Sequence, residues 1–173
     1  MTRAADNALP RAVHRMSVLY ANGWGVPEDT TKAYEYCLRA AELEDPDAQC
    51  DMGLYYVRGE IVEQNYAEAV KWFRLSALQG DMEAQYYLGF AYAVGDGVEQ
   101  DYAEAVKWFN YAALQGDLNA HAYLGKCYYE GLGVEQDYEK AIQYLNSSAQ
   151  EDDLAQLYLG LCYANGYGVE VDY

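Results

Sequence analysis

The stretch LGFAYAVGDGVEQDYAEAVKWF, residues 88–109, is the clearest copy of a unit that recurs along this chain. The glycine that opens its Gly-x-Gly-Val loop returns every 36 residues, and once after 35. The equivalent glycines are Gly23, Gly59, Gly95, Gly131 and Gly166. A tyrosine stands three residues before each glycine, at Tyr20, Tyr56, Tyr92, Tyr128 and Tyr163. A fixed period of this length is typical of a stacked repeat array.

Each unit is predicted to be a helix, a short loop and a second helix. In the third unit, Asp81 is a good N-cap for a first helix over residues 82–94. Gly95 suits the left-handed position after that helix, and Asp101 caps the next one. We find no segment that alternates polar and apolar residues with period two, so we expect no sheet. The predicted fold class is all-α.

The repeats set the predicted domain organisation. Residues 1–10 are the ragged end of a preceding repeat, and residues 11–173 form the repeat domain. Within that domain we expect four repeats and a final half repeat. Their ranges are 11–44, 45–80, 81–116, 117–151 and 152–173.

The units share the pattern Leu-Gly-x-x-Tyr-x-x-Gly-x-Gly-Val-x-x-Asp-Tyr-x-x-Ala-x-x-Trp. This pattern resembles the Sel1-like repeat family, which is related to the tetratricopeptide repeats. The resemblance covers the chain from about Pro10 to Tyr173. The tetratricopeptide repeat itself fits less well, because its 34-residue unit lacks the glycine loop. The resemblance implies an α/α superhelical solenoid with a curved groove, acting as an adaptor or scaffold in protein complexes.

Several positions depart from the repeated pattern. Ser17 replaces a glycine found in the other units, and Ile61 replaces the second loop glycine. Tyr36 and Tyr144 stand where the other units have tryptophan, and Lys140 takes a glutamate position at a helix start. We therefore expect a weaker first repeat and a weaker helix start at residue 138.

Composition limits the possible partners. The formal net charge is −17, and 52% of the 173 residues are hydrophobic, which is enough to build a core. An acidic chain is poorly suited to nucleic acid or anionic membranes and favours basic partners, although solubility alone also explains the charge. No apolar run is long enough to span a membrane.

The sequence carries no recognisable catalytic, cofactor or metal motif. Gly95-Asp96-Gly97 follows a helix and recurs as a turn, so a nucleotide site is not expected. His14 and His121 belong to different repeats, and no zinc or calcium ligand spacing is present. We expect no cofactor and no metal, and a packing or hydrogen-bonding role for His121.

The four cysteines lack a CxxC pairing and favour buried thiols in a reducing compartment. They are Cys37, Cys50, Cys127 and Cys162. We see no signal peptide at the start of the chain, so a cytoplasmic location is predicted, as is typical of proteins with free cysteines.

In the superfamily that the sequence resembles, first helices line the concave groove. Counting from the Leu-Gly pair, the groove positions of the second repeat are Asp47, Cys50, Leu54, Val57 and Arg58. Those of the third repeat are Glu83, Tyr86, Phe90, Ala93 and Val94, and those of the fourth are Asn119, Ala122, Lys126, Tyr129 and Glu130. Such a strip suits a peptide or helix with apolar anchors and basic flanks. The alternative is that these side chains only pack against the neighbouring first helix.

The predicted function is a non-enzymatic protein-interaction scaffold that binds a peptide or helix in this groove. One alternative is a hydrolase, or a glycan- or peptide-binding protein, with a deep pocket that contains His121 or a perturbed carboxylate. Another is a spacer within a longer protein. We also expect Leu154, Leu157, Tyr158 and Leu161 to be poorly covered, as in a fragment of a longer array or a chain that self-associates through this end.

Overall fold

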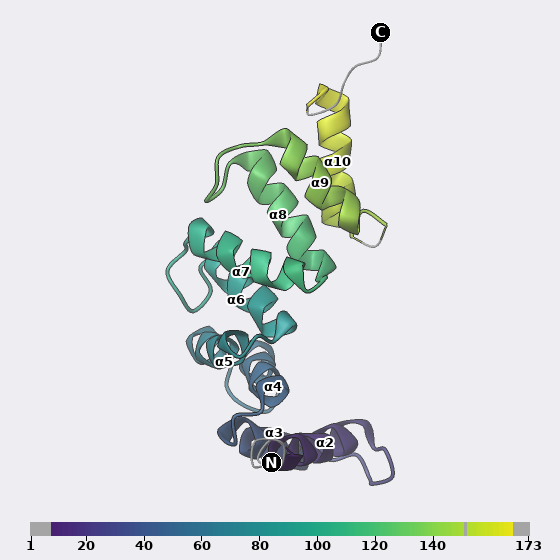
Figure 1. Cartoon of the computed structure of the whole chain (residues 1–173). Coiled ribbons are helices and arrows are strands. Elements are labelled where there is room, and N and C mark those ends of the chain that lie inside the picture. Colours follow the sequence, from purple (N-terminus) through teal and green to yellow (C-terminus); the bar gives the residue numbers. More distant parts are fainter. Residues whose placement is uncertain (1–7, 151, 168–173) are drawn as a thin grey trace. The chain divides into compact units, whose positions relative to one another are not determined.

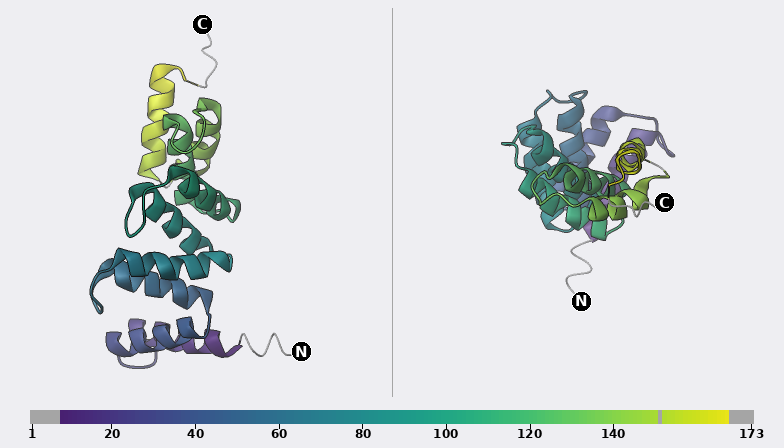
Figure 2. Two further views of the ribbon diagram at one scale, coloured as in Figure 1. Left: turned by 90° about the vertical axis from the view of Figure 1, so that its left-hand side faces the viewer. Right: turned by 90° about the horizontal axis from the view of Figure 1, so that it is seen from above.

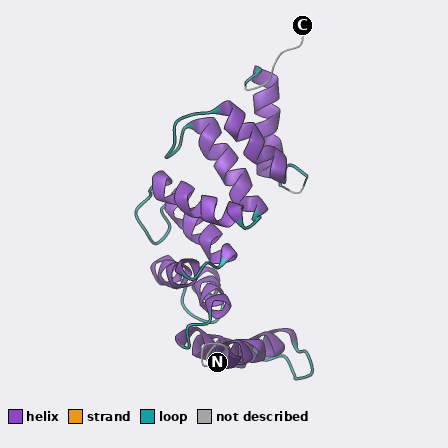
Figure 3. Cartoon of the chain, in the orientation of Figure 1, coloured by secondary structure: helices purple, strands orange, loops and turns teal. Residues whose placement is uncertain are grey.

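The structure is a computed structural model that describes residues 8–150 and 152–167. Over these residues it is all-α, with nine helices and no strand (Figure 3). The helices, shown in Figure 1, are α2 (Ala8–Asn22), α3 (Thr30–Glu42), α4 (Pro46–Arg58), α5 (Tyr66–Leu78), α6 (Met82–Val94), α7 (Tyr102–Leu114), α8 (Leu118–Glu130), α9 (Tyr138–Ser148) and α10 (Asp153–Asn165). The predicted fold class and the predicted helix over 82–94 are confirmed.

The chain forms two compact units, Met1–Ala84 and Gln85–Tyr173. In the first unit, α2 packs against α3, α3 against α4 and α4 against α5 (Figure 2). In the second unit, α7 packs against α8, while α8 and α9 both pack against α10. Residues 1–7 of the predicted N-terminal segment and 168–173 of the predicted half repeat lie outside the described residues.

Acidic and amide side chains start the helices, as the sequence predicts. Asp81 Oδ1 accepts a hydrogen bond from the Ala84 amide at 2.7 Å, and Asp101 Oδ1 accepts from two amides of α7. At α9, Asp137 still caps the helix and pairs with Lys140 Nζ at 3.2 Å. Each cap satisfies an amide that the helix itself leaves without a partner.

The loop glycines end the first helices. Gly59 has φ +69° and donates its amide to the Tyr55 carbonyl, which closes the last turn of α4. Gly95 and Gly97 both have positive φ, which costs glycine little because it has no Cβ. Ile61, at the second loop position of the second repeat, does not adopt positive φ. The loop thus tolerates this substitution by taking another backbone conformation there.

The core consists mainly of alanine with a few larger side chains. In the first unit, one cluster comprises Val13, Cys37, Ala40, Ala41, Ala48 and Met52, and Phe73 of α5 is also buried. In the second unit, one cluster centres on Phe109 and Leu124 and another on Leu145 and Leu159. Alanine lets the helices approach closely, and the large side chains fill the space that remains.

Candidate functional site

A shallow hollow of about 210 Å³ lies on the first unit between α2 and α4. Its α2 side is formed by Ser17, Val18, Ala21 and Asn22, and its α4 side by Asp51, Leu54, Tyr55 and Arg58. Both helices are the first helices of their repeats, so the hollow lies on the surface that the sequence predicts as a groove. A hollow lined by both apolar and charged side chains can hold a peptide side chain.

The groove residues predicted in the first unit are mostly accessible. Leu54 and Val57 are half-buried, and Asp47, Arg58 and Glu83 are exposed. Of these residues, the structure brings Leu54 and Arg58 together in the hollow.

Cys50 is the exception among these residues, because the structure buries it. Its side chain is only 3% exposed and lies near the start of α6. Burial, followed by the nearby carboxylates of Asp81 and Glu83, raises the pKa of its thiol. The prediction that Cys50 faces a partner is therefore wrong, since this thiol fills space between helices.

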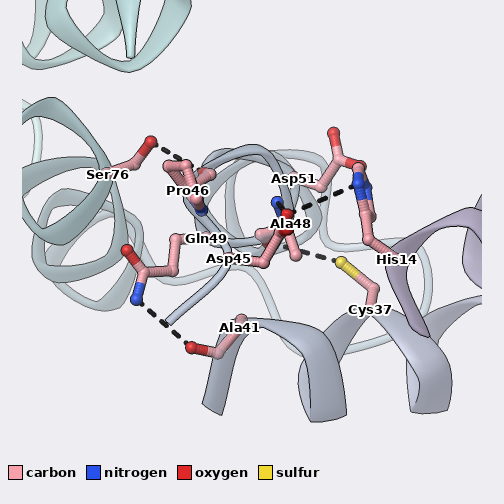
Figure 4. A network of polar contacts seen from close by, with 9 residues as sticks. All are labelled: His14, Cys37, Ala41, Asp45, Pro46, Ala48, Gln49, Asp51 and Ser76. Carbon is pink, nitrogen blue, oxygen red and sulfur yellow. Dashed lines mark hydrogen bonds and ion pairs between the residues drawn. The ribbon is translucent and has the colours of Figure 1, made fainter. Parts of the chain in front are cut away.

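A polar network on the same unit joins α2 to the start of α4 (Figure 4). His14 Nε2 lies 2.9 Å from Asp51 Oδ2, and His14 Nδ1 lies 3.5 Å from Asp45 Oδ1. Asp45 is 1% exposed and caps α4 by accepting the Ala48 amide at 3.0 Å. The hydrogen bond to Asp51 raises the pKa of His14, burial lowers it, and the carboxylates of Asp51, Asp45 and Asp47 raise it further.

Sequence reasoning missed this network, although one signal could have found it. Asp51 occupies the position of Tyr87, Tyr123 and Tyr158 in the later repeats, and His14 occupies that of Cys50. Two polar side chains thus replace residues of the packing pattern in neighbouring first helices. When two neighbouring first helices both depart from the repeat pattern with polar side chains, those side chains can form a contact that the repeat fold itself does not need.

The second unit presents aromatic rings at its predicted groove positions. Tyr86 and Phe90 of α6 contact Tyr123 of α8, with ring centroids 6.1 and 5.6 Å apart. Tyr86 also lies 6.1 Å from Phe109, and burial raises its pKa. These rings therefore pack against the neighbouring first helix, as in the alternative interpretation of the groove.

The rest of the predicted groove in this unit is mixed. Tyr129 packs edge-on against Tyr158 at 5.2 Å, and the Tyr158 hydroxyl donates a hydrogen bond to Glu130. Lys126 is half-buried, whereas three residues are exposed: Val94, Asn119 and Glu130. The structure buries two predicted positions, Ala93 and Ala122, which leave no surface for a partner.

His121 takes part in packing, in agreement with the sequence. Its Nδ1 lies 2.7 Å from the Asp117 carbonyl oxygen, and its ring lies 5.9 Å from Tyr144. These contacts occupy the side chain within α8 and against α9.

The apolar side chains of α10 differ in exposure. Leu157 and Leu161 are 58% and 37% exposed, as expected. Tyr158 is only 8% exposed, because Tyr129 and Glu130 cover it, so the expectation that it is poorly covered is wrong.

Over the residues described, each helix is too short or too polar to cross a lipid bilayer.

Several proteins resemble the chain in structure. A protective antigen of uropathogenic Escherichia coli with an SLR fold is 41% identical, with a TM-score of 0.86 over 99% of this chain. This chain spans only 37% of that antigen. A Sel1 repeat protein from Oxalobacter formigenes is 37% identical, with a TM-score of 0.85 over 99% of this chain and 71% of its own.

A more distant structure and a family of repeats also match this chain. Cysteine-rich protein B of Helicobacter pylori shares the fold at 21% identity, with a TM-score of 0.57 over 75% of this chain and 93% of its own. No curated protein matches the sequence. The Sel1 repeat matches residues 10–45, 46–81, 83–117, 118–153 and 154–173. Proteins built from this repeat are generally protein-interaction scaffolds and typically non-catalytic. With repeats matched along nearly its whole length, the chain belongs to the Sel1 repeat family.

Proposed function

We propose that this chain is a non-enzymatic scaffold that binds a peptide or helix with apolar anchors and basic flanks on the first-helix surface of its first unit. The observation that carries the proposal is the hollow between α2 and α4, which contains the half-buried Leu54 beside the exposed Arg58. An apolar side chain of a partner would enter the hollow and contact Leu54 and Tyr55. Burial of that side chain would supply the main favourable free energy.

The charges around the hollow support a basic partner. Asp51 lies on its rim, Asp47 is exposed on the first turn of α4, and the whole chain carries a formal charge of −17. Opposite charge on the partner would speed association and fix its orientation more than it would add affinity. The guanidinium group of Arg58, which also lines the hollow, would bind a carboxylate of the partner.

In this proposal, the second unit contributes less to peptide binding than the first. Tyr86 and Phe90 are already engaged with Tyr123, so replacing them would disturb packing as well as binding. Only their exposed edges would add contact area. We also propose a cytoplasmic location, which the four buried free cysteines support.

The proposal can be tested with a library of random peptides displayed on phage and selected against the full chain. Selected peptides should combine Lys or Arg with a large apolar residue and should also carry a carboxylate that pairs with Arg58. Leu54→Glu and Arg58→Glu should each weaken their binding by at least about tenfold, which is about 1.4 kcal/mol. Circular dichroism should show that both variants keep the helix content of the wild type.

Leu78→Glu is the matched control, because Leu78 is 69% exposed on the second helix α5. It makes the same change outside the hollow and should leave binding unchanged. Peptides that bind Leu54→Glu and Arg58→Glu as well as the wild type would show that the hollow is not the site.

A further inference from the structure

The network that joins His14 to α4 contains a group of metal-ligating atoms. One atom each from His14, Asp45 and Asp47 lies within 4.8 Å of the other two. His14 comes from the middle of α2, while Asp45 is the N-cap of α4 and Asp47 lies in its first turn. Two packed helices therefore hold the imidazole and the carboxylates near one another. All three residues belong to the first unit.

The spacing of the half-buried His14 and the buried Asp45 fits a small ion. Ligand atoms about 2.1 Å from a tetrahedral zinc ion lie roughly 3.4 Å from one another. His14 Nδ1 and Asp45 Oδ1 are 3.5 Å apart. Asp47 is exposed, so rotation of its side chain can bring a carboxylate oxygen closer. Water would complete the coordination.

A second observation concerns the other oxygen of the Asp45 carboxylate, since Oδ1 faces His14 and accepts the Ala48 amide. Asp45 is 1% exposed, and its Oδ2 is buried without a hydrogen-bond partner. Only one other described buried side-chain atom, Trp108 Nε1, shares this condition. A buried carboxylate oxygen without a donor is costly, and a bound cation would remove that cost.

The orientation of His14 suits metal binding. Its Nε2 can donate a hydrogen bond to Asp51 Oδ2 at 2.9 Å, which leaves the lone pair of the neutral ring on Nδ1, facing Asp45. Metal-bound histidines usually hold a carboxylate on the other ring nitrogen in this way. Asp51 would act as a positioning residue rather than a ligand.

The next repeat offers an internal comparison. There, Cys50 takes the place of His14, Asp81 that of Asp45 and Glu83 that of Asp47. The Cys50 thiol makes a hydrogen bond with the Asp81 side chain, and Asp81 is not among the described residues with an orphan buried oxygen. The Ser76 hydroxyl and the protonated Cys50 thiol both give Asp81 a side-chain donor, and Asp45 Oδ2 has none. The repeat architecture therefore does not itself require an unpartnered carboxylate at this position.

We propose that His14, Asp45 and Asp47 bind a divalent transition-metal ion of the Zn²⁺ class, with Asp51 holding the histidine in place. An imidazole with two carboxylates suits zinc and similar ions, whereas magnesium and calcium prefer oxygen ligands alone. The partial positive charge at the start of α4 opposes a cation, and the carboxylates of Asp45, Asp47 and Asp51 outweigh it. The metal site shares Asp47 and Asp51 with the proposed peptide site, but it is inferred from observations other than the hollow.

The test is calorimetric titration of the full, untagged chain with Zn²⁺, repeated with Mg²⁺ and Ca²⁺. We expect one Zn²⁺ per chain, a higher melting temperature with Zn²⁺, and no comparable binding of the other two ions. His14→Gln should abolish this binding, and Asp47→Asn should weaken it at least about tenfold. Asp51→Asn should weaken it by about 10- to 100-fold, the range found for such positioning residues.

Two matched variants control for adsorption to the acidic surface. His121→Gln replaces the other histidine of the chain, and Asp96→Asn removes an exposed loop carboxylate. Both should bind Zn²⁺ like the wild type. Asp47→Asn changes an exposed side chain, so it keeps the test valid even if His14→Gln does not fold. Absence of Zn²⁺ binding, or equal binding by Asp47→Asn and Asp96→Asn, would overturn the proposal.

Discussion

At the scale of single residues, one helix position shows how the repeats control their packing. Gly53, Gly89 and Gly125 face Phe73, Phe109 and Leu145 on their second helices. In the first repeat the pair becomes Ser17 and Cys37, both buried and joined by a side-chain hydrogen bond. The larger residue on one helix is matched by a smaller one on the other. Ser17 is thus compensated rather than simply a weak point of the first repeat.

The same position gives a prediction with an internal control. A Cβ at Gly89 would lie 2.8 Å from Phe109 Cδ1, whereas none of the described atoms lies within 4 Å of one at Gly160. Gly89→Ala should lower the free energy of unfolding by about 1–3 kcal/mol through overpacking. Gly160→Ala should raise it by up to about 1 kcal/mol, because alanine is the better helix former. Urea unfolding measures both, and equal effects would contradict this account of the packing.

Tyr55 makes stability depend on alkaline pH. Burial raises its pKa to about 12, from about 10 in an unfolded chain. Between these values the unfolded chain releases the proton and the folded chain keeps it, so stability falls as pH rises. Tyr55→Phe should make the free energy of unfolding, measured in urea, fall less steeply over this range of pH. Identical pH profiles for wild type and Tyr55→Phe would argue against this role.

At the scale of elements, a glutamine side chain joins three of the glycine loops to the helix before them by a hydrogen bond. The Nε2 atoms of Gln64, Gln100 and Gln136 donate to the carbonyls of Val57, Ala93 and Tyr129 at 2.7–2.8 Å. The last carbonyls of a helix lack partners within it, so these bonds stabilise the first-helix ends. In the first repeat the equivalent residue is Glu28, whose carboxylate cannot donate.

This difference predicts opposite effects of two substitutions. Glu28→Gln should raise the free energy of unfolding by about 0.5–1.5 kcal/mol, the usual net value of one hydrogen bond. Gln100→Glu should lower it by at least as much, since the Ala93 carbonyl loses its donor. Thermal unfolding of both variants measures the effect. A gain from Gln100→Glu would rule out the proposed role of the glutamine.

At the scale of the whole molecule, the net charge of −17 should make stability depend on salt. Like charges repel in the compact state, and salt shortens the screening length from about 30 Å at 0.01 M to about 8 Å at 0.15 M. The melting temperature should therefore rise over this range of sodium chloride. An unchanged or falling melting temperature would show that self-repulsion does not limit stability.

The fold could be predicted from the sequence because the repeat fixes it locally. Asp81 and Asp101 mark helix starts through their side chains, and Gly95 marks a helix end through its positive φ, so one copy predicts the others. The site was harder to predict, because burial depends on neighbouring helices. The sequence does not show that Cys50 is buried, or that Tyr123 contacts Phe90. His14 and Asp51 meet across 37 residues and belong to no spacing motif.

The central claim is that the first-helix surface of the first unit, around the α2–α4 hollow, is where this chain binds its partner. Hydrogen exchange of the full chain, with and without a selected basic and apolar peptide, tests it most directly. We predict slower exchange in α2 and α4, centred on Leu54 and Arg58, with little change in α3 and α5. Protection confined to the second helices, or to the second unit, would contradict the claim.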